Sequence, residues 1–158
     1  MTRVGIGYDS HRFAPGRALV LGGVRIPHPA GLAGHSDADA VAHAVADALL
    51  GAAGLGSIGQ HFPDTDPRWK DADSIGLLRQ VATLLTERGL AAVQLDVTVI
   101  AEAPRIGPHA AAMAAALGGA LALAPEAVNV KGKTNEGMGF IGRGEGIAAL
   151  AVATLEAR

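Results

Sequence analysis

The stretch Val-Gln-Leu-Asp-Val-Thr-Val-Ile at residues 93–100 decides the fold class, because its alternating side chains make the clearest strand pattern in the chain. Working outward, strand patterns are also predicted at residues 3–9, 18–26 (a hairpin around a Gly-Gly turn), 128–131 and 147–155. Helices rich in alanine and leucine are predicted at residues 37–53, 74–88 and 109–123. This order predicts one α/β domain over residues 1–158, in which helices cover one face of a mixed β-sheet.

The segment between the first two helices, residues 55–73, is rich in glycine, proline and aspartate and is predicted to form a long loop. We expect residues 60–73 of this loop to close over a bound ligand. The helix ends carry capping residues: Ser36 or Asp37 for the first start and Gly54 for its end, Asp73 or Ser74 for the second start and Gly89 for its end.

The composition excludes several classes of protein. The 158 residues include no cysteine, so disulfides and thiolate chemistry are excluded, and a metal must be held by histidine and carboxylate. The net charge is −2 without a basic cluster, which argues against nucleic acid as a partner. The apolar stretch 110–124 is shorter than a membrane span needs, and the residues after Met1 have no signal-peptide pattern. We therefore expect a cytoplasmic protein with no membrane partner.

Three residues have a spacing that suits a metal site. Asp9 and His11 are separated by one residue, so in a strand both side chains leave the same face. His43 lies in the middle of the first helix, with Asp39 and Asp47 four residues away on either side. Two histidines and one aspartate fill three positions of a tetrahedral zinc and leave the fourth open. Asp39 or Asp47 is expected to orient His43 through its second ring nitrogen.

Both parts of this pattern have a purely structural alternative. Asp-x-His is a short motif that also ends strands, and a lone helical histidine is often structural. His35-Ser36-Asp37 before the first helix fits a helix cap, but its backbone N–H groups and the Ser36 hydroxyl also suit an anion.

Two glycine motifs do not predict nucleotide binding. Gly132-Lys133-Thr134 ends like a phosphate-binding loop, but that loop needs a glycine where this chain has Ala127. The GxGxxG pattern at residues 137–142 is followed by too few residues for the helix, strand and acidic residue of a dinucleotide site.

Nearly end to end, the chain resembles the 2-C-methyl-D-erythritol 2,4-cyclodiphosphate synthase family. The motifs that carry this resemblance are long and specific: Gly7-Tyr8-Asp9-Ser10-His11, Gly22-Gly23, His35-Ser36-Asp37-x-Asp39, Phe62-Pro63-Asp64-Thr65-Asp66-Pro67, Ala101-x-Ala103-Pro104-Arg105 and Gly139-Phe140-x-Gly142-Arg143-Gly144-Glu145. Two departures from the family pattern stand out. Ser57 replaces the usual aspartate, and Thr134 stands without the threonine-rich run that often precedes Glu136.

The resemblance implies a homotrimer whose sheets face the threefold axis and whose active sites lie between subunits. It implies zinc on Asp9, His11 and His43, and a second divalent ion, Mg²⁺ or Mn²⁺, on Glu136 with the substrate diphosphate. It implies that His35 and Thr134 contact phosphate and stabilise the transition state. The remaining substrate-binding residues that it implies are Ser36, Ile58, Gly59, Phe62 and Asp64 for the methylerythritol phosphate, Ala101, Ala103, Pro104 and Arg105 for the cytidine, and Phe140 and Arg143, with Glu145, at the axis.

The implied substrate is a CDP-linked small molecule, 4-diphosphocytidyl-2-C-methyl-D-erythritol 2-phosphate. Its 2-phosphate attacks the β-phosphorus and CMP leaves, so catalysis depends on positioning and on cations. Two alternatives stay open from the residues alone. One is a zinc phosphoesterase that uses water as its nucleophile, and the other is a zinc-stabilised trimeric binding module without turnover.

The predicted strands of the last third of the chain also favour a trimer. Residues 93–100, 128–131 and 147–155 carry apolar or small side chains on both faces, as in Ala148–Val152. Helices cover one such face, and a neighbouring subunit is the simplest cover for the other.

Overall fold

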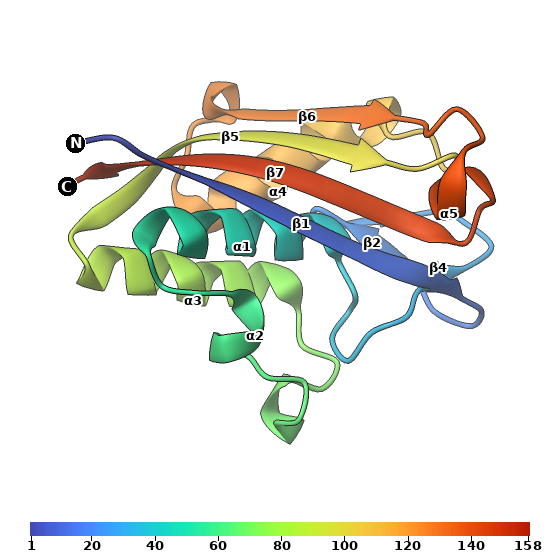
Figure 1. Ribbon diagram of the computed structural model, residues 1–158, viewed down its shortest axis with the longest axis horizontal. Helices are drawn as coiled ribbons and strands as arrows, with labels where there is room; N and C mark the ends of the chain where they lie inside the picture. The colour runs from blue at the N-terminus through green and yellow to red at the C-terminus, as the bar shows by residue number, and fades with distance from the viewer.

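Five strands of the protein form one mixed sheet in the order β4-β1-β7-β5-β6 (Figure 1). The computed structural model describes residues 1–158. The long strands β1 (Arg3–Ala14), β7 (Gly146–Ala157) and β5 (Leu90–Ile100) pair antiparallel. Strand β6 (Val128–Lys133) pairs parallel with β5, and the short β4 (Gly31–Leu32) pairs with the end of β1. The predicted mixed sheet is therefore confirmed, and the predicted hairpin is a separate pair, β2 (Leu19–Leu21) and β3 (Val24–Ile26).

The three long helices cover one face of this sheet, as predicted. Helix α1 (Ala40–Ala53) packs on β1 and β7, α4 (Ala110–Leu121) packs on β6, and α3 (Ser74–Glu87) packs against both helices and β5. Their apolar side chains and the inward side chains of the strands form one core, which makes the protein a single-domain α/β fold. The short elements are α2 (Ile58–His61), η1 (Pro67–Trp69), η2 (Gly107–His109), η3 (Pro125–Ala127) and α5 (Gly139–Gly142).

Strand β1 lies directly on α1 because its inward positions include glycines. A Cβ atom on Gly7 would lie 1.9 Å from the Ala44 carbonyl oxygen, and one on Gly5 would lie 2.1 Å from the Ala48 oxygen. No larger residue leaves room for this approach. The close packing brings the inward side chains of β1 against the first turns of α1.

The structure corrects the predicted start of the first helix and confirms that of the second. Asp39, not Ser36 or Asp37, caps α1 and accepts a hydrogen bond from the Ala42 N–H. The reason is Ala38, whose φ of 58° is left-handed and delays the helix. Asp73 caps α3 as predicted. The predicted long loop holds α2 and η1, and backbone bonds from Asp71 and Asp37 fasten its end to the His35–Asp37 segment.

The uncovered face of the sheet is apolar at one side and polar at the other. Val4, Ile6 and Tyr8 of β1 and Val152 of β7 are exposed there. In contrast, β5 and β6 present Asp96, Asn129 and Lys131, which bond to one another. The prediction of two apolar faces for β5 and β6 is therefore wrong, because the sequence alternates there between apolar inward and polar outward residues. The apolar patch belongs to β1 and β7.

None of the helices combines the length and the apolar character that a membrane crossing requires.

Candidate metal centre and active site

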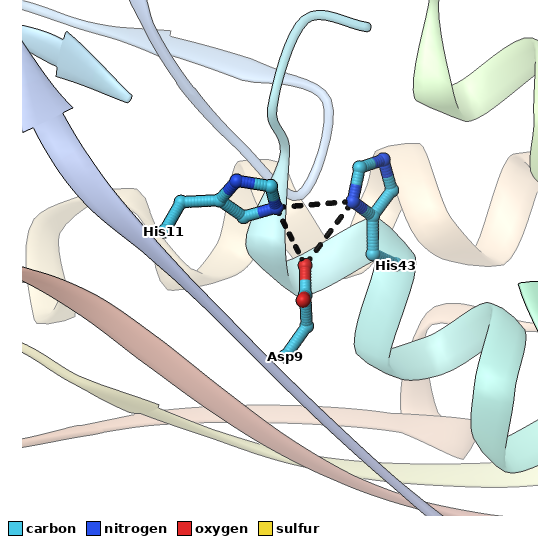
Figure 2. A group of neighbouring side chains, drawn as sticks. All are labelled: Asp9, His11 and His43. Atoms are coloured by element: carbon cyan, nitrogen blue, oxygen red, sulfur yellow. Dashed lines mark hydrogen bonds and ion pairs between the residues drawn. The ribbon is translucent and has the colours of Figure 1, made fainter. Parts of the chain in front are cut away.

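Asp9, His11 and His43 converge on one point, as their spacing predicts (Figure 2). Asp9 and His11 leave the inward face of β1, and His43 reaches them from the first turn of α1. The Asp9 Oδ2 atom lies 2.8 Å from His11 Nε2 and 3.1 Å from His43 Nδ1, and the two ring nitrogens are 3.3 Å apart. Three donor atoms from two elements thus form a triangle with nearly equal sides.

The triangle fits a small metal ion. Zinc lies ~2.0–2.2 Å from nitrogen and oxygen ligands in a tetrahedral site, which puts ligand atoms roughly 3.3 Å apart. The observed separations of 2.8–3.3 Å come close to that value before any ion draws the ligands into position. The donor set of two imidazoles and one carboxylate also suits a borderline transition metal such as zinc. The residues present therefore fit a metal centre with a fourth position open.

The contact between Asp9 and His11 favours the charged form of each side chain. Burial disfavours the charged carboxylate, but hydrogen bonds from His11 and His43 outweigh that effect and lower the pKa of Asp9 to about 2. Burial also opposes the charge of His11, yet its bond to Asp9 raises its pKa. The carboxylate is therefore ionised at neutral pH, as a metal ligand must be.

The remaining ring nitrogens of the two histidines are held by partners that the sequence did not predict. His11 Nδ1 lies 2.7 Å from the Ala33 carbonyl oxygen. His43 Nε2 lies 2.9 Å from the Ser74 hydroxyl and 3.2 Å from the Ser36 hydroxyl. Ser74 is buried at the start of α3, 31 residues from His43, and no local pattern links the two.

The predicted roles of Asp39 and Asp47 in orienting His43 are wrong. Fully buried Asp39 accepts backbone hydrogen bonds from Gly22, Gly23 and Ala42, and so ties the β2–β3 hairpin to α1. Asp47 accepts a bond of 2.7 Å from the Ile58 N–H and ties α2 to α1. Helical spacing puts both acids near His43, but their carboxylate oxygens instead accept hydrogen bonds from nearby backbone N–H groups. Burial raises the pKa of Asp39 to about 6.

The metal donors open into a cavity of about 410 Å³. The residues predicted to face the methylerythritol phosphate line it together with His11 and His43: His35, Ser36, Ile58, Gly59, Phe62 and Asp64. Four further wall residues were not among the predicted site residues: Gly34, Pro63, Trp69 and Leu77, although Trp69 stands out as the only tryptophan of the chain. Its ring meets Phe62 edge-on at 5.0 Å. Ser57 caps α2 outside this wall.

A second cavity, of about 570 Å³, lies at the ends of β5 and β6. Ala101, Pro104 and Arg105 line it together with Thr134, while Ala103 belongs to the same segment without reaching the wall. Glu102, which was not predicted, accepts hydrogen bonds from the Asn135 and Gly137 N–H groups. The two segments predicted to hold cytidine and phosphate are thereby joined to each other.

The other predicted residues of this end are exposed. Glu136 lies between Asn135 and Gly137 in the sequence and has a left-handed φ of 53°. Phe140, the second residue of α5, is 42% exposed and lines a third hollow beside the end of β1. Arg143 pairs with Glu145 at 2.8 Å. No residue lines both the first and the second cavity, so one chain does not bring all the predicted site residues together.

Comparisons with known proteins agree with this geometry. The chain matches the YgbB family over residues 2–156. It is 59% identical over 154 residues to the 2-C-methyl-D-erythritol 2,4-cyclodiphosphate synthase of Dechloromonas aromatica (strain RCB), with 98% of this chain and 96% of that protein covered.

Solved structures give the same result. The chain superposes on a CDP-bound 2C-methyl-D-erythritol-2,4-cyclodiphosphate synthase with a TM-score of 0.89 at 41% identity, covering 98% of this chain and 100% of the other. It also superposes on the bifunctional IspDF of Campylobacter jejuni, with a TM-score of 0.96 at 41% identity. That match spans 100% of this chain and 43% of the larger protein.

Proposed function

The chain belongs to the YgbB family, the 2-C-methyl-D-erythritol 2,4-cyclodiphosphate synthases, and from this premise we propose how its residues close the cyclic diphosphate of isoprenoid precursor biosynthesis. The enzyme is a lyase that converts 4-diphosphocytidyl-2-C-methyl-D-erythritol 2-phosphate to the cyclodiphosphate and CMP. One observation carries the proposal. Three metal donors converge, and two of them, His11 and His43, line a cavity together with the residues predicted for the methylerythritol phosphate.

The reaction needs positioning more than proton transfer. An oxygen of the 2-phosphate forms a bond to the β-phosphorus, the bond from that phosphorus to the CMP oxygen breaks, and its electron pair leaves with CMP. Two anionic groups must therefore be held together while charge builds on the leaving phosphate. In this proposal, His35 and the Ser36 hydroxyl hold the attacking phosphate at one side of the cavity. Phe62 and Ile58 exclude water from the methylerythritol moiety.

The metals complete this arrangement. Asp9, His11 and His43 would hold zinc, which would supply a Lewis acid for the phosphate groups of the substrate. The exposed Glu136 suits a hard cation, Mg²⁺ or Mn²⁺, only together with phosphate oxygens, because a single carboxylate rarely holds such an ion. Thr134 lies beside Glu136 and lines the second cavity, where we place the cytidine diphosphate against Ala101, Ala103, Pro104 and Arg105.

We further propose that the active site forms between subunits of a homotrimer. The separate cavities support this idea, since the methylerythritol and cytidine parts of one substrate must meet. The exposed apolar side chains of β1 and β7 support it too, because a partner that covers them gains hydrophobic free energy. Phe140 and Arg143 then lie at the axis, with Glu145 compensating the arginine charge. Light scattering at low micromolar protein should give three times the mass of one chain.

A turnover assay tests the activity and its main alternative together. With zinc and magnesium present, ³¹P NMR should show the cyclic diphosphate appearing together with CMP. In H₂¹⁸O the product should carry no solvent oxygen. An open-chain product labelled with ¹⁸O would instead indicate the zinc phosphoesterase. Absence of any turnover by the zinc-loaded protein would favour the binding module. The cytoplasmic location and the use of the whole chain as one catalytic domain stay predictions.

A further inference from the structure

Ser74 is a buried polar residue that the reaction described above does not use. It is the first residue of α3 and is 1% exposed. Its hydroxyl oxygen lies 2.9 Å from Nε2 of His43, the ring nitrogen that faces away from Asp9 and His11. It is absent from the wall of the 410 Å³ cavity, so a ligand there does not reach it.

The Ser74 hydroxyl donates a hydrogen bond to Asp37. The Ser74 O–H donates to Asp37 Oδ1, and the Ser74 backbone N–H donates to Asp37 Oδ2 at 3.0 Å. An ionised carboxylate only accepts hydrogen bonds, so this polarity is fixed. The Ser74 oxygen then faces His43 with a lone pair and accepts from Nε2. When a metal ion occupies Nδ1 beside Asp9, the proton of the neutral His43 ring lies on Nε2, where Ser74 accepts it.

Ser36 is the only other residue whose hydroxyl lies within hydrogen-bonding distance of His43 Nε2, and its position suits phosphate binding instead. Its hydroxyl lies farther away, at 3.2 Å, and already accepts from the Ala38 N–H. Unlike Ser74, it lines the cavity. With Ser74 accepting from His43, the Ser36 proton stays free to donate to a phosphate in the cavity.

We propose that Ser74, oriented by Asp37, is the positioning residue that fixes the tautomer and ring orientation of His43 for metal binding. The inference rests on the proposed metal site. It makes the Asp37–Ser74–His43 chain the counterpart of the Ala33 carbonyl, which holds the other histidine, His11, through Nδ1. Removing such a partner of a metal ligand typically weakens metal binding ~10–100-fold.

The test compares two neighbouring positions at the start of α3. Ser74→Ala removes the acceptor of His43. Asp73→Ala removes the helix cap, which accepts from Ile75 and Gly76, but leaves the contact with His43 intact. Zn²⁺ affinity is measured on zinc-free protein by competition with a chelator. Ser74→Ala should bind Zn²⁺ ~10–100-fold more weakly, whereas Asp73→Ala should lose thermal stability and keep its affinity.

A second variant reads the contact between Ser74 and His43 directly and does not remove the serine. Asp37→Asn puts an amide beside the hydroxyl, so the Ser74 O–H is free to turn toward His43 and no longer holds a lone pair toward Nε2. In ¹⁵N NMR of the zinc-loaded protein, the Nε2–H of His43 should exchange slowly with water in the parent and faster in Asp37→Asn.

Three results would overturn the proposal: unchanged Zn²⁺ affinity in Ser74→Ala, equal weakening in Ser74→Ala and Asp73→Ala, or equally fast exchange of the His43 Nε2–H in the parent and Asp37→Asn. Zinc retained by His43→Ala would overturn the metal site itself, which separates the failure of the proposed function from that of this inference.

Discussion

Two parts of the molecule are built in opposite ways: the metal end, which carries Asp9, His11 and His43, and the phosphate-loop end, which carries Thr134 and Glu136. Asp9, His11 and His43 are half-buried and bonded to one another before any ligand arrives. At the other end Thr134 and Glu136 lie on an exposed turn, to which Glu102 bonds through two backbone N–H groups. The first end is preorganised by the core, because β1 and α1 pack directly on each other. The second end follows the tips of two strands and, in the proposed trimer, receives its walls from a neighbour.

The largest expected effect comes from breaking the preorganised end. His43→Ala removes one of three donors, so bound zinc should fall from one per chain to almost none and turnover should drop by about 10³-fold or more. Metal analysis and the ³¹P assay measure the two losses, and circular dichroism should show an intact fold. His28→Ala is the matched control, because His28 stacks on Phe13 away from the cavity. A zinc-replete, active His43→Ala protein would contradict the assigned centre.

The next effect comes from the exposed end. Glu136→Gln keeps the shape of the side chain but removes the charge for the second ion, and turnover should fall by about 10²-fold. Zinc content should stay at the parent value, which is the opposite of the His43→Ala result. Raising the Mg²⁺ concentration should recover part of the lost rate. Tight Mg²⁺ binding to the substrate-free protein, equal in parent and variant, would show that Glu136 has no such role.

A mixture of the two variants decides whether the two ends meet across subunits. Co-expressed His43→Ala and Glu136→Gln chains form random mixed trimers, and about a quarter of the shared sites then combine an intact metal end with an intact phosphate end. Activity should rise from near zero to about a quarter of the parent level. A mixture as inactive as its components would place the whole site within one chain.

The two ends also differ in what the sequence predicted. The strand period put Asp9 and His11 on one face, and that prediction is confirmed because β1 is regular there. The meeting with His43 depends on Gly7 lying against Ala44, a long-range contact without a local pattern. Helical spacing failed for Asp39 because the start of α1 needed its carboxylate as a cap. Ser74 was missed because only the packing of α3 on α1 brings it to His43.

The residues of the phosphate-loop end came from family resemblance alone. Glycine-rich turns and exposed side chains there have no periodicity from which burial or direction follows. The structure adds Glu102 to that end, and the sequence offered no reason to choose it over other exposed acids.

The smallest expected effect concerns the strands that carry the exposed end. Lys131 of β6 donates to Asp96 of β5, and Asn129 donates to the same carboxylate at 2.8 Å. The bond from Lys131, and then that from Asn129, lowers the pKa of Asp96. Because the folded pKa lies below the unfolded value of ~3.9, the pair stabilises the fold above that pH and its contribution disappears as pH falls through the folded pKa.

Asp96→Asn should therefore lower the free energy of unfolding at pH 7 by only ~0.2–1 kcal/mol, since the pair is about half exposed and screened by solvent. Denaturant unfolding of both proteins between pH 7 and pH 3 measures the difference, which should shrink toward zero at the acid end. Glu126→Gln, a change of an exposed acid in η3, is the control and should show no such trend. A difference that grows on acidification would mean that Asp96 is stabilised in its protonated form. A difference well above 1 kcal/mol would mean that the pair is buried by a partner, as the proposed trimer allows.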